Sequence, residues 1–313
     1  MLTASLLLLL SLCILTFGAE MLVRGSTGAA ARLGLSPLFI GLTIVGFGTS
    51  TPELATGIVA AIEQHDDINV GNIVGSNICN IAVILGGAAI ISPIAITSRS
   101  IRSEAVIVLL VAFMPFCAVL TGGITRWLGM LMLLALMAYV WRGFRAGRAA
   151  GSETTEGHEV SMSVGRSAML IVVSIALLAF GSYILVSSAT DIARLLGLTE
   201  LAIALTVVAL GTSAPELFTS VIAAIRGRAD IALGNVLGSN VFNILGILGM
   251  TSIIRPQAVN GQVLAFDGPV MVAMSLTCLI LVWRGTCIGR IAGFLLVLSY
   301  AIYCAAVMLL SSQ

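Results

Sequence analysis

Charged side chains are scarce in this sequence. Of its 313 residues only 9% are charged and 59% are hydrophobic, whereas roughly a quarter of the residues in an ordinary soluble domain are charged. Lysine is absent, so all fifteen basic residues are arginine, and the net charge of +1 provides no basic surface for a nucleic acid. The composition therefore excludes a soluble domain and a nucleic-acid-binding protein, and it predicts a membrane protein with several spans.

Motifs for metal, redox or catalytic chemistry are missing as well. The two histidines, His65 and His158, stand alone in polar segments, and we expect both to be solvated. The six cysteines are scattered without the paired spacing of zinc or disulfide sites. No nucleophile and base pair lies within an apolar run. We therefore expect neither an enzyme nor a bound cofactor, and nothing indicates an obligate protein partner.

Ten apolar runs are long enough to cross a bilayer, because a membrane-spanning helix needs about 20 residues. The first run lacks the basic leader and the cleavage site of a signal peptide, so we interpret it as a retained helix. The ten runs are residues 2–20, 36–62, 70–92, 103–121, 125–141, 167–189, 199–225, 231–253, 263–283 and 287–311.

The placement of arginine predicts the orientation. With the N-terminus outside, twelve of the fifteen arginines fall on inward connections, and inward connections are enriched in basic residues. The polar segment 142–166 then becomes a flexible cytoplasmic linker. We predict an integral plasma (inner) membrane protein with its N- and C-termini outside.

The sequence is also duplicated. A shift of 163 positions superposes residues 46–81 on 209–244 without a gap, and about half of the paired residues are identical. Each copy contains five runs, an odd number, so the copies enter the membrane from opposite sides. We predict an all-α fold of ten transmembrane helices, with residues 1–141 and 167–313 as two inverted five-helix repeats. Such repeats are typical of secondary transporters, with the substrate near the midplane.

Each copy places a carboxylate deep in an apolar run, in the motifs GTSTPE and GTSAPE. Glu53 and Glu216 lie about 15 Å from their helix ends, and a carboxylate at that depth usually faces an aqueous cavity or a bound ion. Pro52 and Pro215 lack an N–H group, so we expect a distorted turn with freed carbonyl groups before each glutamate. Glu20 lies nearer a helix end, and we interpret it as a solvated interfacial carboxylate.

Neutral oxygen atoms share the helix faces of the two glutamates or form stripes on the following helices. These residues are Thr49, Ser50, Thr212 and Ser213 beside the glutamates, and Asn72, Ser76, Asn80, Asn235, Ser239 and Asn243 on the next helices. Asn77 and Asn240 point about 100° away, and we assign them to packing or interhelical hydrogen bonds. An all-oxygen site with two carboxylates suits Ca²⁺, and its charge is balanced equally by one Ca²⁺ or two Na⁺.

These motifs resemble the two alpha repeats of the prokaryotic sodium/calcium exchanger family, within the cation/Ca²⁺ antiporter superfamily. The similarity rests on GFGTSTPEL with GNIVGSNICN in the first copy, and on ALGTSAPELFTS with GNVLGSNVFN in the second. It implies that Glu53, Glu216 and the carbonyl groups of Thr49 and Thr212 hold Ca²⁺. For Na⁺ it implies overlapping ligands, namely Ser50, Ser76, Ser213, Ser239 and the carbonyl groups of Gly46 and Ala209.

The resemblance implies a secondary antiporter that exchanges Ca²⁺ for Na⁺ by alternating access and expels Ca²⁺. It also implies that the long first and sixth helices slide across a more rigid core. Asn243 stands where many exchangers carry an aspartate, so H⁺ or K⁺ as the counter-ion, or another divalent cation as cargo, stays open. A Ca²⁺-permeable channel is the alternative from a different class. The expected partners are Ca²⁺, Na⁺ and the lipid bilayer.

Overall fold

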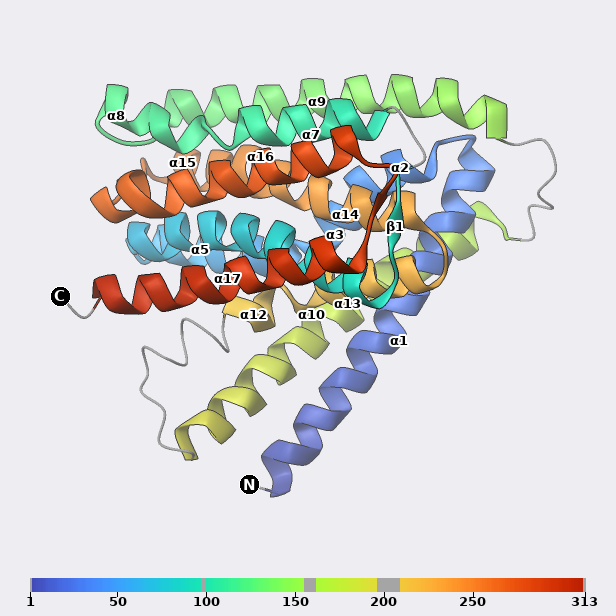
Figure 1. Ribbon diagram of the computed structural model, residues 1–313, viewed down its shortest axis with the longest axis horizontal. Coiled ribbons are helices and arrows are strands. Elements are labelled where there is room, and N and C mark those ends of the chain that lie inside the picture. The colour runs from blue at the N-terminus through green and yellow to red at the C-terminus, as the bar shows by residue number, and fades with distance from the viewer. Residues whose placement is uncertain (1, 97–99, 155–161, 196–208, 312–313) are drawn as a thin grey trace.

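The computed structural model describes residues 2–96, 100–154, 162–195 and 209–311, and this part of the chain is almost wholly helical (Figure 1). The all-α class is therefore confirmed. The helical stretches long and apolar enough to cross a membrane in this part are Thr3–Leu33, Asp66–Ile91, Ser100–Thr121, Arg126–Ala149, Val164–Leu195, Ala229–Ile254, Val263–Arg284 and Arg290–Leu309. A further crossing arises if the bent pair Pro37–Thr49 and Thr51–Ile62 counts as one span.

The elements of the first half are α1 (Leu2–Leu33), α2 (Pro37–Ile40), η1 (Gly41–Val45), α3 (Gly46–Thr49), α4 (Thr51–Ile62), α5 (Asp66–Cys79), η2 (Asn80–Leu85), α6 (Gly86–Ile91), β1 (Ile94–Ala95), α7 (Ser100–Val111), η3 (Met114–Cys117), α8 (Ala118–Thr121) and α9 (Arg126–Thr154). Those of the second half are α10 (Val164–Leu195), α12 (Ala209–Thr212), α13 (Ala214–Ile225), α14 (Ala229–Val241), η5 (Phe242–Leu248), α15 (Gly249–Ile254), η6 (Val263–Asp267), α16 (Gly268–Arg284), β2 (Cys287–Ile288) and α17 (Arg290–Ser311). The elements η1, η2, η5 and η6 are π-helical turns, and η3 is a 3₁₀ turn.

Nine of the ten predicted runs correspond to these crossings. Of the run 199–225, residues 199–208 lie outside the described part of the chain, and the remainder forms α12 and α13. The count of ten helices and the inverted repeats therefore stay predictions.

Two helices extend further than the apolar runs indicated. α1 continues past residue 20 to Leu33, where Gly34 adopts a φ of +62° and ends the helix in the left-handed conformation. α9 continues to Thr154 through the first half of the segment 142–166, because the alanines and arginines there favour helix. The structure thus describes residues 142–154 of that segment as helix, and residues 155–161 lie outside the described part of the chain.

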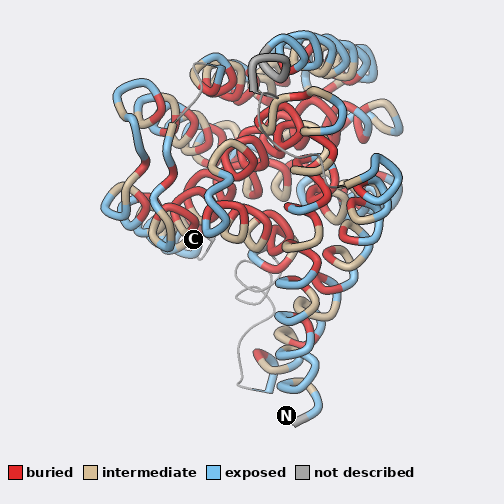
Figure 2. Tube along the Cα trace, turned by 90° about the vertical axis from the view of Figure 1, so that its right-hand side faces the viewer, coloured by how far each residue is buried: buried red, intermediate tan, exposed pale blue. Residues whose placement is uncertain are grey.

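The most deeply buried helices are those that follow the two glutamate motifs. In the most apolar 18-residue segment of Ala229–Ile254, every residue is buried. The corresponding share is 78% in Asp66–Ile91 and at most 39% in the other long helices. Figure 2 shows this buried centre surrounded by exposed helices. α1 and α10 pack side by side and cross the remaining helices obliquely (Figure 1). The molecule thus consists of an inner group around α5 and α14, flanked by a two-helix arm.

Both glutamate-bearing helices break just before Pro52 and Pro215, where the sequence analysis predicted a distorted turn. The helical stretch Pro37–Thr49 and α4 meet at an angle of 48°, with Ser50 between them at φ −79° and ψ 10°. Ser213 separates α12 from α13 with nearly the same dihedral angles, φ −86° and ψ 9°. Each proline occupies the first turn of the second helix, where the lack of an N–H group is tolerated.

Connections of the two halves pair with one another. β1 pairs with β2 in antiparallel fashion, with Ile94 opposite Ile288. An isolated bridge joins Ile124 to Gln257. Ile94 and Gln257 are related by the shift of 163 residues that superposes the duplicated motifs, so corresponding connections of the two halves make corresponding contacts.

Candidate cation site

The two glutamates lie at equivalent places in the broken helices. Glu53 is in the first turn of α4 and Glu216 is in the first turn of α13, and each residue is only 1% exposed. The N-terminal end of a helix carries a partial positive charge. The breaks therefore offset part of the cost of holding a carboxylate inside an apolar environment.

Two hydrogen bonds cross between the halves and bring the carboxylates together. Ser50 Oγ donates to Glu216 Oε1 at 2.9 Å, and Ser213 Oγ donates to Glu53 Oε1 at 3.2 Å. Each serine stands three residues before its own glutamate, so each helix break serves the carboxylate of the opposite half. The structure thus gathers these four predicted ligands in one place.

No protein cation neutralises the pair within the described residues. Arg24 and Arg226 pair with Glu20, Arg142 pairs with Glu104, and Arg255 pairs with Asp66. No group of three or more His, Cys, Asp or Glu side chains gathers there either. When both carboxylates are ionised, their charge therefore has no protein counter-ion among these arginines.

Several buried oxygen atoms have no hydrogen-bond partner in the described chain, and four of them belong to predicted ion ligands. These four are Glu53 Oε2, Glu216 Oε2, Asn80 Oδ1 and Asn243 Oδ1. A buried acceptor left unpaired costs about 1–3 kcal/mol, and such groups in native structures call for an explanation, such as an ion. All four belong to residues that the sequence analysis assigned to the cation site.

Thr49 and Asn235 support the glutamate of the second half. Thr49 Oγ1 lies 3.0 Å from Asn235 Oδ1, and Asn235 Nδ2 donates to the backbone carbonyl of Glu216 at 3.2 Å and to Ser220 Oγ at 2.9 Å. The four-residue spacing placed Asn235 on the correct face of α14, but sequence reasoning did not include it among the ligands. Its partners lie on two other elements, α3 and α13, which the spacing cannot identify.

The remaining predicted ligands lie around the two helix breaks. Ser239 Oγ donates to the carbonyl oxygen of Gly46 at 3.3 Å, which also accepts from the Ser50 backbone N–H at 3.1 Å. Ser76 is buried on α5 at the position corresponding to Ser239. Ala209 begins α12 and Thr212 ends it, so both lie in the helical turn before the break.

Asn77 and Asn240 make the interhelical hydrogen bonds that the sequence analysis predicted. Asn80 Nδ2 donates to Asn240 Oδ1 at 3.0 Å, and Asn243 Nδ2 donates to Asn77 Oδ1 at 3.3 Å. Both bonds run between α5 with η2 in one half and α14 with η5 in the other. In Asn80 and Asn243 the amide nitrogen is thereby hydrogen-bonded, whereas the amide oxygen has no partner in the described chain.

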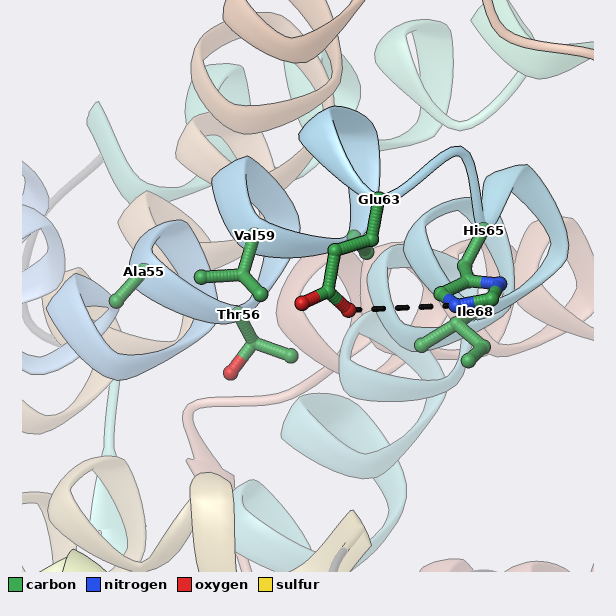
Figure 3. A pocket seen from close by; sticks show the side chains of 7 residues that line it. Ala55, Thr56, Val59, Glu63, His65 and Ile68 are labelled. Atoms are coloured by element: carbon green, nitrogen blue, oxygen red, sulfur yellow. Dashed lines mark ion pairs between the residues drawn. The ribbon is translucent and has the colours of Figure 1, made fainter.

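A separate hollow of about 360 Å³ lies along α4 and the start of α5 (Figure 3). It is lined by Ala55, Thr56, Val59, Ala60, Glu63, His65 and Ile68. Glu63 Oε2 and His65 Nε2 are 4.0 Å apart, and both side chains are more than half exposed. The interpretation of His65 as solvated is therefore confirmed, while His158 lies outside the described residues. None of the predicted ion ligands lines this hollow.

Comparisons with known proteins agree over nearly the whole chain. The family model described as "Sodium/calcium exchanger protein" matches residues 3–144 and 166–309. Sodium/calcium exchanger MaX1 of Methanosarcina acetivorans is 32% identical over 338 aligned residues, which cover 95% of this chain and 96% of MaX1. Inner membrane protein YrbG of Escherichia coli is 32% identical, with 99% and 98% covered. A solved structure of the sodium-calcium exchanger NCX_Mj superposes with a TM-score of 0.84 at 31% identity, over 97% of this chain and 98% of that chain.

Proposed function

The chain belongs to the sodium/calcium exchanger family, and from this premise we propose that it exchanges Ca²⁺ for Na⁺ across the membrane by alternating access, in the direction of Ca²⁺ efflux. It is an integral membrane protein of a transporter family, not an enzyme.

The observation that carries this proposal is the set of unpaired buried oxygens on Glu53, Glu216, Asn80 and Asn243. Ca²⁺ takes six to eight oxygen ligands in flexible geometry, and these four atoms supply the first of them. We assign the remainder of the site to the hydroxyl groups of Ser50, Ser76, Ser213 and Ser239 and to the carbonyl groups of Gly46, Thr49, Ala209 and Thr212.

The charge of the site explains why transport would be an exchange. With no protein cation beside them in the described chain, the two carboxylates leave the empty site with two negative charges when both are ionised. Moving an uncompensated charge through an apolar environment costs several kcal/mol, so the empty protein changes its exposed side slowly. One Ca²⁺ or two Na⁺ cancels the charge, and only the loaded forms cross readily.

The architecture we propose is that of ten helices in two inverted repeats, with both termini outside and the connection between α9 and α10 in the cytoplasm. The hydrogen bonds Ser50–Glu216 and Ser213–Glu53 support the repeats. Ser213 corresponds to Ser50 and Glu216 to Glu53, so each bond is the counterpart of the other. The arginine distribution supports the orientation.

Uptake of isotopic Ca²⁺ into proteoliposomes tests the function. Vesicles are loaded in turn with Na⁺, K⁺ or acid, so that each outward gradient is imposed alone. We expect saturable uptake driven by the Na⁺ gradient. Uptake driven only by K⁺ or H⁺ would identify the other counter-ion, and fast, unsaturable uptake without any gradient would identify a channel.

A further inference from the structure

The paired asparagines of the inner helices have a role in the geometry of the cation site. We propose that Asn77 and Asn240 are positioning residues, which fix the amide orientation of Asn243 and Asn80 and so direct the carbonyl oxygen of each toward the cation. This inference rests on the proposed function, since it concerns ligands of the same site.

The orientation follows from the chemistry of a side-chain amide. An asparagine presents an acceptor oxygen on one side and two N–H donors on the other. Because Asn77 offers its oxygen to Asn243 at 3.3 Å, Asn243 has to turn its nitrogen toward Asn77 and its oxygen away. The oxygens that result, on Asn243 and on Asn80, are buried without a partner in the part of the chain described. A reversed amide would present N–H groups to a cation, which repel it.

A third residue fixes the orientation of Asn77 itself. Asn77 Nδ2 lies 3.7 Å from the sulfur of Met271 on α16, which is 1% exposed. A thioether sulfur accepts weak hydrogen bonds and donates none, so the nitrogen of Asn77 faces Met271 and its oxygen faces Asn243. Met271 on α16, Asn77 on α5 and Asn243 on η5 form a chain of contacts, in which each residue sets the amide orientation of the next.

The corresponding chain in the other half lacks its first member. The shift of 163 residues places Val108 where Met271 stands, and valine has no acceptor. Asn240 Nδ2 accordingly has no partner within the described residues. The amide of Asn80 is held by Asn240 alone, so we expect the second chain to be less rigid and its loss to matter less.

The backbone widens at the same place in both halves. The π-helical turn η2 begins at Asn80, and η5 begins at Phe242, directly before Asn243. Single π-helical turns inside α-helices often occur at functional sites. The duplicated helices therefore share a local irregularity at the two amides whose orientation is at issue.

The substitution Asn77→Leu tests the proposal, because leucine has a similar size and offers no acceptor to Asn243. Loss of a group that orients a metal ligand typically weakens metal affinity 10–100-fold. We expect the KM for Ca²⁺ in Na⁺-driven uptake to rise about tenfold, with little change in the maximal rate. In the background of Asn243→Ala, the same substitution should have no further effect. Asn240→Leu should raise the KM by a smaller factor.

Equilibrium binding of ⁴⁵Ca²⁺ to the purified protein provides a readout that does not require exchange. If the wild-type protein binds Ca²⁺ but does not exchange it for Na⁺, the proposed function fails. If wild type exchanges normally and Asn77→Leu leaves the KM unchanged, or raises it equally with and without Asn243, the positioning role is wrong.

A second variant covers the case in which Asn77→Leu does not fold. Met271→Leu conserves volume, lies outside the proposed ligand set and removes only the sulfur acceptor. We expect a rise in KM of about two- to threefold that disappears in the Asn243→Ala background. Val108→Leu, the matched change in the other half, should leave the KM unaltered. Equal effects of the two leucine variants would overturn the proposal.

Discussion

Glu53 and Glu216 each have one carboxylate oxygen held by a serine of the opposite half and one oxygen without a partner in the described chain. Replacement by glutamine keeps the side-chain volume but removes the charge and converts an oxygen into an N–H donor. We expect Glu53→Gln or Glu216→Gln to lower Na⁺-driven Ca²⁺ uptake at least about 100-fold while the protein still folds. Uptake of ⁴⁵Ca²⁺ and size-exclusion chromatography measure the two properties.

Glu63→Gln is the matched control, because Glu63 lies at the end of the same helix and its side chain is 60% exposed. It should exchange at the wild-type rate. Robust exchange by either buried-site variant, or an equal loss in the control, would contradict the assignment.

The residues of the site differ in how far the sequence could predict them. The glutamates and their neighbouring hydroxyl groups follow from depth and helical spacing, which are local properties of the chain. The bond from Ser50 to Glu216 joins residues 166 positions apart, so local spacing contains no information about it. The sequence analysis therefore grouped side chains that the structure brings together, but it could not predict that each serine bonds to the opposite glutamate.

Among the helices, α14 and η1 approach so closely that only glycine fits between them. A Cβ atom added to Gly238 would overlap the carbonyl oxygen of Leu42 and would lie 2.7 Å from its carbonyl carbon. Backbone atoms cannot move aside as a side chain can. We expect Gly238→Ala to destabilise the protein by about 3 kcal/mol, measured as a lower melting temperature in detergent.

The control for this prediction is Gly87→Ala on α6. A Cβ atom there would meet only a Leu217 methyl group at 3.6 Å, an ordinary contact, and alanine favours helix more than glycine. Its melting temperature should equal or exceed that of wild type. Equal melting temperatures for the two variants would show that the close approach does not limit stability.

An ion pair joins the helical arm to the inner group. Glu20 on α1 pairs with Arg24 at 2.6 Å and with Arg226, at the end of α13, at 2.9 Å. Its side chain is 19% exposed, so Glu20 still reaches water, as predicted, but it is also ion-paired, which sequence reasoning did not predict. The partner on α13 follows Glu216 by ten residues and lies far from Glu20 in the sequence, which explains why sequence reasoning missed it.

If α1 slides during transport, this ion pair stabilises one position of the arm. Both arginines are more than half exposed, so the contribution is at most ~1 kcal/mol. We expect Arg226→Gln to change the ratio of the KM values for Ca²⁺ on the two sides of the membrane by up to about fivefold. The reciprocal double variant Glu20→Arg with Arg226→Glu should return the ratio toward wild type, whereas failure of this rescue would count against an ionic cause.

The ends of the helices were harder to predict than their existence. Apolar runs locate the segments that need lipid or a core, but a helix ends where its backbone is capped. α1 passes through Arg24 and Arg32 and stops only at Gly34, whose φ of +62° suits glycine. α9 likewise extends beyond its apolar part to Thr154. Hydropathy therefore underestimated the length of both helices.

For the whole molecule, a comparison of corresponding helices in the two halves shows which residues the fold does not require and which therefore bear on the orientation in the membrane. α9 and α17 are corresponding helices under the shift of 163 residues. Trp141, Arg145 and Arg148 at one end of α9 correspond to Cys304, Met308 and Ser311 on α17. The fold thus tolerates either set of residues at the C-terminal part of these helices, and of the two sets only that of α9 contains arginine.

Arginines resist transfer across the membrane, so the end of α9 that carries them should stay in the cytoplasm and the corresponding end of α17 should lie outside. We expect alkaline phosphatase fused after residue 313 to be active in cells, and the same enzyme fused after Arg148 to be inactive. A fluorescent protein should give the opposite pattern. Changing Arg142, Arg145 and Arg148 to glutamine should raise phosphatase activity at the second position, because the barrier to transfer is then removed. An inactive phosphatase at the C-terminus, with fluorescence there instead, would show that the predicted orientation is reversed.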